Sequence, residues 1–223
     1  MTNKLLFFVL LALCFSGCDM LETHPYDVHI TGERELNNKN IQLIENKMQG
    51  KKTIRFAMIS DTQRWYNSTE DVVKALNARG DIDFVIHGGD QSDFGVTKEF
   101  IWMRDIFNKF QMPYVCLLGN HDCLGTGEDA YRAIYGDPNF AFTAGNVRFI
   151  CLNTNAMEYD YSEPVPDFNF IENELNNLSP EIEKTVFAMH VKPFEFVFNN
   201  NVAKNLPTIR QPVPQSPVLS LRP

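Results

Sequence analysis

The sequence predicts an α/β fold in which parallel strands carry polar residues to one edge of a sheet. Three apolar runs each end in polar residues: 56–59, 84–86 and 114–118. Successive runs are about 30 residues apart, which is typical of a strand-helix-strand unit. Asp61 follows the first run, Asp90 the second, and Asn120 and His121 the third. Open α/β sheets bind ligands at the carboxyl edge of their strands, so we expect these side chains to converge.

The composition indicates one globular domain with room for a core. Of the 223 residues, 44% are hydrophobic and 12% are aromatic, which excludes disorder of the whole chain. The formal net charge of -8 excludes a general nucleic-acid-binding surface, because phosphate backbones require a basic face. The five cysteines show no paired spacing, so they predict no disulfide framework.

Residues 1–17 are typical of a secretory signal peptide, because Lys4 precedes an apolar run over 5–15. That run is short for a permanent membrane span. Its end, Ser16-Gly17-Cys18, resembles the lipobox of bacterial lipoproteins, in which the cysteine carries the lipid. We therefore expect export to the bacterial cell envelope, periplasmic or outer surface, with a membrane anchor through lipid on Cys18. A plain cleaved signal or a short anchor helix is the alternative.

The first half of the chain is predicted as follows. Residues 18–50 are polar and indicate a tether followed by irregular or edge structure. The domain is expected over 51–204. It begins with a strand at 51–60, a helix from Asn67 or Ser68 to about Asn77, a strand at 84–87, an amphipathic helix at 97–110 and a strand that starts at Pro113.

The second half continues the alternation and then changes character. It predicts a helix at 128–135, a hairpin of strands at 140–143 and 147–153, a helix capped by Asp167, and a strand at 185–189 that ends in His190. Residues 205–223 have five prolines and no periodicity. They indicate a Pro-rich irregular tail or, as the alternative, a shifted reading frame or truncated gene.

The polar cluster has the chemistry of a metal site. Two carboxylates, an amide oxygen and an imidazole are suitable ligands for divalent ions such as Mn, Fe, Zn or Mg. A carboxylate shared between two ions holds them about 4 Å apart, where they polarise a phosphoryl oxygen. Asp90 is the candidate bridging residue.

At this point the chain resembles the calcineurin-like metallophosphoesterases, over residues 54–198. The resemblance rests on four blocks in order: Ser60-Asp61-x-Gln63, Gly88-Gly89-Asp90-x-x-Asp93, Gly119-Asn120-His121-Asp122 and His190. It implies a β-sandwich flanked by helices in four α/β/β/α layers, two divalent metal ions, and metal-dependent hydrolysis of a small phosphoester substrate.

The resemblance also implies a role for each matching residue. Asp61 would bind the first ion, Asp90 would bridge, and Asn120 and His190 would bind the second. His121, oriented by Asp122, would stabilise the transition state or protonate the leaving oxygen. Asn120 and His121 would contact the phosphate. Arg64, which is near the cluster, is a further candidate phosphate contact, with an exposed loop charge as the alternative.

Two departures from the family pattern concern the metal ligands. Gln63 stands where the family has histidine, and its amide oxygen is a weaker ligand for transition metals. The family's closing Gly-His-x-His block has no counterpart after His190, so the fold is expected to be incomplete at the C-terminus and the activity impaired. The alternatives are a noncatalytic metal- or anion-binding envelope lipoprotein and a nonfunctional fragment.

Overall fold

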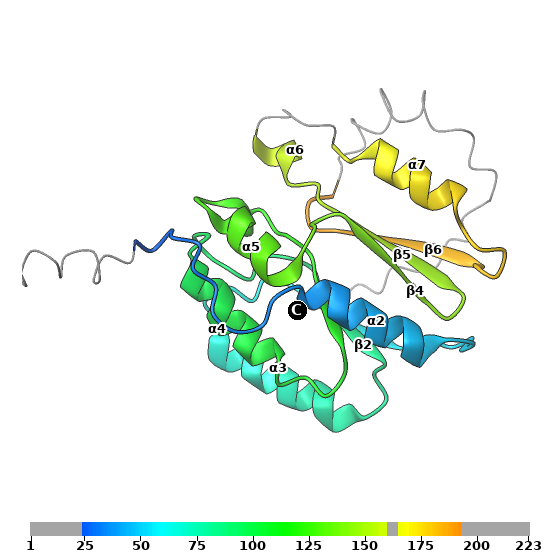
Figure 1. Ribbon diagram of the computed structural model, residues 1–223. Helices are drawn as coiled ribbons and strands as arrows, with labels where there is room; N and C mark the ends of the chain where they lie inside the picture. The colour runs from blue at the N-terminus through cyan, green and yellow to red at the C-terminus, as the bar shows by residue number, and fades with distance from the viewer. Residues whose placement is uncertain (1–23, 160–164, 193–223) are drawn as a thin grey trace, which may run out of the picture. The chain divides into compact units, whose positions relative to one another are not determined.

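The computed structural model describes residues 24–159 and 165–192 (Figure 1). All of these except Lys192 belong to one compact unit, which ends at Val191. The predicted signal peptide, Cys18 and the Pro-rich tail lie outside the described residues. None of the helices within those ranges has the length and apolar character needed to cross a membrane.

Helices and strands alternate from α2 to β3 and are mixed in the rest of the described structure, which confirms the predicted α/β class. In chain order they are α2 (Leu36–Met48), β1 (Phe56–Ile59), α3 (Tyr66–Arg79), β2 (Phe84–His87), α4 (Thr97–Phe107), β3 (Tyr114–Cys116), the 3-10 helix η2 (His121–Cys123), α5 (Gly127–Tyr135), β4 (Phe140–Ala144), β5 (Val147–Leu152), α6 (Ala156–Tyr159), α7 (Phe168–Asn176) and β6 (Lys184–Met189). The first strand and the second predicted helix are shorter than expected. As predicted, Asp167 caps α7 by accepting the N–H group of Phe170.

The strands form two three-stranded sheets. In the first sheet β2 lies between β1 and β3 and is parallel to both. In the second sheet β4 and β5 form the predicted antiparallel hairpin, and β6 adds to β5 in parallel. The carboxyl ends of β1, β2 and β3 therefore lie at one edge, as the sequence predicts.

The alternating side chains of each strand divide the core into layers, which confirms the four-layer α/β/β/α sandwich. On one face of the first sheet, Val85 and Cys116 pack with the apolar faces of α4 and α5. On its other face, Phe84 and Ile86 pack with Phe142 and Phe149 of the second sheet. The outer face of the second sheet is covered by α7, as Figure 1 shows.

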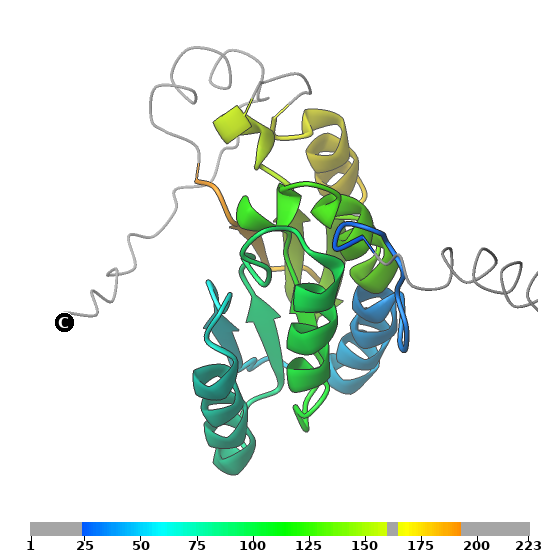
Figure 2. The ribbon, with the colours of Figure 1, turned by 90° about the vertical axis from the view of Figure 1, so that its left-hand side faces the viewer.

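The expectation of a tether and irregular structure over 18–50 is wrong for its second part, because Leu36–Met48 form helix α2. Figure 2 shows α2, in blue, and α3, in teal, on opposite sides of β2. The inward face of α2 includes Ile44 and Met48, but also Asn37, whose side chain lies 2.9 Å from both the N–H and the carbonyl of Cys116. The side-chain amide of Asn37 thus pairs with the edge of β3 as a neighbouring strand would. Because a polar residue occupies this inward position, the apolar periodicity of the sequence did not predict the helix.

Candidate metal centre

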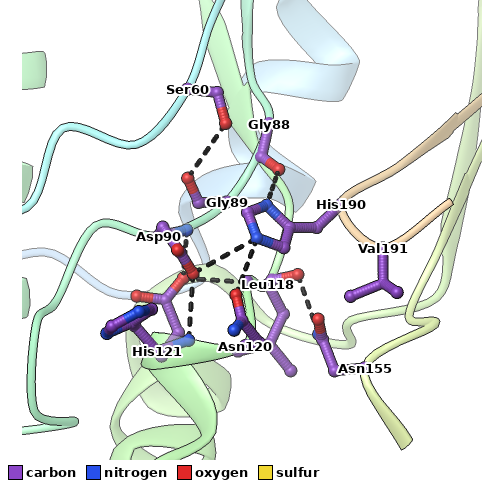
Figure 3. A network of polar contacts seen from close by, with 12 residues as sticks. Ser60, Gly88, Gly89, Asp90, Leu118, Asn120, His121, Asn155, His190 and Val191 are labelled. Atoms are coloured by element: carbon purple, nitrogen blue, oxygen red, sulfur yellow. Dashed lines mark hydrogen bonds and ion pairs between the residues drawn. The ribbon is translucent and has the colours of Figure 1, made fainter. Parts of the chain in front are cut away.

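Three predicted ligands meet at the carboxyl edge of the strands. Asp61 follows β1, Asp90 follows β2, and His190 follows β6 in the second sheet. Each offers one ligand atom, and these atoms all lie within 4.8 Å of one another. Figure 3 shows Asp90 and His190 side by side in this cluster. The structure thus brings together groups from both sheets.

The backbone at the two aspartates has a left-handed conformation. The φ angle is 57° at Asp61 and 62° at Asp90, a region that costs residues other than glycine on the order of 1 kcal/mol or more. Two hydrogen bonds hold the loops in place: Asp61 donates its N–H to Gly89 at 3.1 Å, and Gln63 donates its N–H to the Asp90 carbonyl at 3.2 Å. Strained backbone that the surroundings hold in this way is typical of functional sites.

The close approach of the loops after β2 and β3 requires glycine at position 119. A Cβ atom there would lie 2.1 Å from the backbone nitrogen of Asp90 and 2.2 Å from its Oδ1. Gly89, with φ of 104°, likewise packs directly against Gly119 and the imidazole of His190. The glycines let the carboxylate of Asp90 sit between the two loops.

The imidazole of His190 is oriented toward the carboxylates. Its Nδ1 lies 2.8 Å from the Gly88 carbonyl oxygen, which can only accept, so Nδ1 carries a proton. Its Nε2 lies 2.9 Å from Oδ1 of Asn120 and 3.4 Å from Oδ1 of Asp90 (Figure 3). An imidazole held at Nδ1 by a backbone carbonyl presents Nε2 to a metal ion in many sites.

Gln63 joins the cluster through its side-chain amide. Its Nε2 is 3.4 Å from Oδ2 of Asp90, and its Oε1 is buried without a hydrogen-bond partner in the described structure. Buried polar atoms without partners are rare and call for an explanation such as an ion. Together with two carboxylates, an amide oxygen and an imidazole, this orphaned oxygen makes a donor set that fits divalent cations.

Asp90 is the central residue of the cluster. Its side chain is nearly buried, and its Oδ1 accepts the backbone N–H of His121 at 3.0 Å. Burial raises the pKa of this carboxyl, while His190 nearby lowers it. A buried carboxylate between neighbouring ligands is where a bridge between two cations is expected.

Asp122 does not orient His121 as expected. Its fully buried carboxylate instead accepts four backbone N–H groups, from Asp90, Gln91, Ser92 and Gly119, at 2.8 to 2.9 Å. Burial raises the pKa of Asp122 to about 6, against the lowering effect of the N–H groups of Ser92, Gly119 and Gln91. The reason is geometric: Asp122 lies in η2, and its side chain faces the backbone amides of the loops after β2 and β3.

His121 is positioned by Asp93 rather than by Asp122. Its Nδ1 lies 3.0 Å from the backbone carbonyl of Asp93 and 3.6 Å from that residue's carboxylate. The carbonyl contact raises the pKa of His121. Arg64 also reaches the buried carboxylate of Asp93, at 3.0 Å, so two of the three predicted phosphate contacts, Arg64 and His121, are held by one residue. The imidazole of His121 remains partly exposed beside the ligand cluster.

Comparison with known proteins now decides the family. Residues 54–212 match the model of the calcineurin-like phosphoesterases, which covers more than half of the chain. The chain belongs to this family. A 3',5'-cyclic-nucleotide phosphodiesterase from Nostoc sp. strain PCC 7120 is 27% identical over 124 residues, which span 55% of this chain and 46% of that protein. A purple acid phosphatase from yellow lupin (Lupinus luteus) seeds is 17% identical, with a TM-score of 0.48, over 62% of this chain and 30% of that chain.

Two residues that support the candidate site were not identified from the sequence. Thr154 donates its hydroxyl to the carbonyl of Val191 at 2.7 Å, next to His190. Asn155 donates its amide to the carbonyl of Leu118 at 2.9 Å, shortly before Asn120 (Figure 3). Both follow β5, where the polar run Asn153-Thr154-Asn155 after an apolar strand repeats the pattern of the other site loops.

Proposed function

We propose that this phosphoesterase hydrolyses small phosphoester substrates with the help of two divalent metal ions. The single observation that carries the proposal is the convergence of Asp61, Asp90 and His190 within 4.8 Å, in a chain that belongs to the family. Phosphoryl transfer requires positive charge at the phosphoryl oxygens, and side chains of this type hold ions that provide it.

The ligands divide between the two ions as follows. Asp61 and the amide of Gln63 would hold one ion, Asn120 and His190 the other, with Asp90 shared. Bound ions supply Lewis-acid polarisation of the phosphoryl group and activate water for attack. This set of carboxylate, amide and imidazole donors is compatible with Mn, Fe, Zn and Mg.

The protein's own groups supply the remaining steps. His121 donates its Nδ1 proton to the carbonyl of Asp93, and in the protonated imidazole the second proton, on Nε2, would pass to the leaving oxygen. Arg64 is mostly exposed while it pairs with Asp93, so its guanidinium remains available to a phosphate oxygen. Asn120 orients the substrate together with His121, since its side chain lies at the same edge.

The similarity to a cyclic-nucleotide phosphodiesterase supports phosphoester hydrolysis, but the match spans 46% of that protein's length. Substrate identity is therefore proposed only at the level of a small phosphoester. Export, with lipid attached to Cys18, is also part of the proposal, supported by the pattern of residues 1–18.

The test is metal content and phosphatase activity of the purified protein, compared with Asp90→Asn and with Asp71→Asn. Asp71 is an exposed aspartate that pairs with Lys74 on the surface of α3, so it controls for loss of one charge. We expect two ions per chain, lost in Asp90→Asn together with at least about 100-fold of the activity. Equal activity in the two variants would contradict the site. Bound metal without turnover in the wild type would instead indicate the noncatalytic binding protein.

A further inference from the structure

A pocket of about 330 Å³ lies directly beside the candidate metal centre. It is lined by the end of β1 and the start of α3, including Ile59, Asp61, Thr62, Trp65, Ser68 and Val72. Asp61 belongs both to this lining and to the ligand cluster, so the pocket adjoins the cluster. The pocket is large enough for a ring system.

Trp65 forms an exposed wall of this pocket on a fixed backbone. Its side chain is 66% exposed, an unusual position for the largest apolar side chain. The backbone N–H of Trp65 donates to the carbonyl of Thr62 at 3.1 Å. The backbone carbonyl of Trp65 accepts both the N–H and the hydroxyl of Thr69, each at 2.8 Å. An indole on an anchored backbone offers a flat surface at a low entropic cost of binding.

The chemistry of the lining selects a neutral, planar group. Asp61 is the single charged residue among those that line the pocket in the described structure, and the others are apolar or carry hydroxyls. A second anionic group is disfavoured beside this carboxylate, whereas an aromatic ring would stack on the indole and contact Val72. The exposed hydroxyl of Ser68 can bond to a polar atom at the ring edge.

We propose that this pocket, the Trp65 pocket, is the subsite for the organic group of the phosphoester, and that it takes a planar aromatic ring stacked on Trp65. This inference rests on the proposed function, because the phosphoryl group is taken to bind at the cluster of Asp61, Asp90 and His190. It makes Trp65 a specificity-determining residue for aryl or heteroaryl phosphoesters over alkyl ones.

A binding experiment tests the pocket without turnover. The chain has two tryptophans, so Trp102→Phe leaves Trp65 as the sole tryptophan, which can be excited selectively over the tyrosines, and phenylalanine retains an aromatic contact with Tyr66. This variant is titrated with benzylphosphonate and ethylphosphonate, which share a head group that cannot be hydrolysed. We expect a blue shift of Trp65 emission that saturates with benzylphosphonate, and no shift with ethylphosphonate. An emission unchanged by benzylphosphonate would overturn the proposal.

A kinetic experiment tests the same pocket in catalysis. Trp65→Ala should lower kcat/KM for phenyl phosphate by roughly tenfold and for glycerol phosphate by less than about twofold. Trp65→Phe, which keeps a ring, should lose less for phenyl phosphate. Equal losses for both substrates in Trp65→Ala would overturn the proposal. If the wild type hydrolyses no phosphoester, the proposed function fails, and the fluorescence titration still decides the subsite.

Discussion

The carboxylate of Asp122 accepts the backbone N–H group of Asp90 at 2.9 Å. The same oxygen accepts the N–H of Gly119 at 2.9 Å, so one buried side chain joins the loops after β2 and β3. The central metal-ligand candidate is thereby held by a residue that lies behind it in the core. Site geometry and fold stability are coupled at Asp122.

Asp122→Asn should weaken both the fold and the site. An amide provides one acceptor oxygen where the carboxylate provides two, and its NH2 group would face backbone donors. We expect a loss of about 2–4 kcal/mol in the free energy of unfolding, measured by urea denaturation, together with loss of bound metal. Asp71→Asn is the matched control. Unchanged stability of Asp122→Asn would show that its four hydrogen bonds contribute little.

Gly119→Ala should remove metal binding while the protein remains folded. The new methyl would lie 2.1 Å from the Asp90 nitrogen, so the two loops must move apart. Gly80→Ala is the control: its Cβ meets nothing within 4 Å, and its positive φ of 67° should cost about 1 kcal/mol without effect on the metal. Metal content of both variants is measured after dialysis. Full metal occupancy in Gly119→Ala would show that the close contact is not needed.

Asn37→Ala should destabilise the protein by about 2–3 kcal/mol, because it leaves the N–H of Cys116 buried without its partner. The Cys116 carbonyl keeps a second donor, the Tyr131 hydroxyl at 2.6 Å. Thermal or urea unfolding measures the effect. The neighbouring Asn38→Ala is the control, since Asn38 is exposed and bonds only to Glu35 among the described contacts, and it should cost less than about 0.5 kcal/mol.

Stability should fall as the pH is lowered through the range in which His87 titrates in the unfolded chain. Burial lowers the pKa of His87 from 6.5 to about 3. Between these values the unfolded state binds a proton that the folded state does not, so acid favours unfolding, by up to about 1.4 kcal/mol per pH unit. His87→Gln removes this proton uptake.

The measurement for His87 is urea unfolding of wild type and His87→Gln at pH 7, 6 and 5. The stability advantage of the wild type should shrink steadily with decreasing pH, because only in the wild type does protonation of His87 stabilise the unfolded state. A difference that stays constant from pH 7 to 5 would mean that the buried imidazole accepts its proton in the folded state.

Periodicity and strand-end polarity were sufficient to predict the sheet that carries the site. The runs before Asp61 and Asp90 are strands, and both residues lie at the predicted edge together with His190. Parallel strands separated by helices align their carboxyl ends by topology alone, which was enough for Asp61 and Asp90, whereas His190 joins them through the packing of the second sheet on the first.

The contacts of individual side chains could not be predicted in the same way. Asp122 follows His121 directly, and adjacency suggested that they interact; the turn of η2 sends the carboxylate to the backbone amides instead. Asn37 lies in a polar segment, and only the unpaired edge of β3 explains its burial in a helix. Such partners are set by three-dimensional approach, which sequence spacing does not encode.

The contact between His190 and Gly88 spans 102 positions of the chain. During synthesis, the ribosome delivers Asp61 and Asp90 long before the segment that contains β6. The first sheet can form early from neighbouring segments, whereas the imidazole arrives only when the second sheet has closed on β5. Metal capture at full affinity would therefore be a late event in maturation, and occupancy of the site would report that β6 has docked.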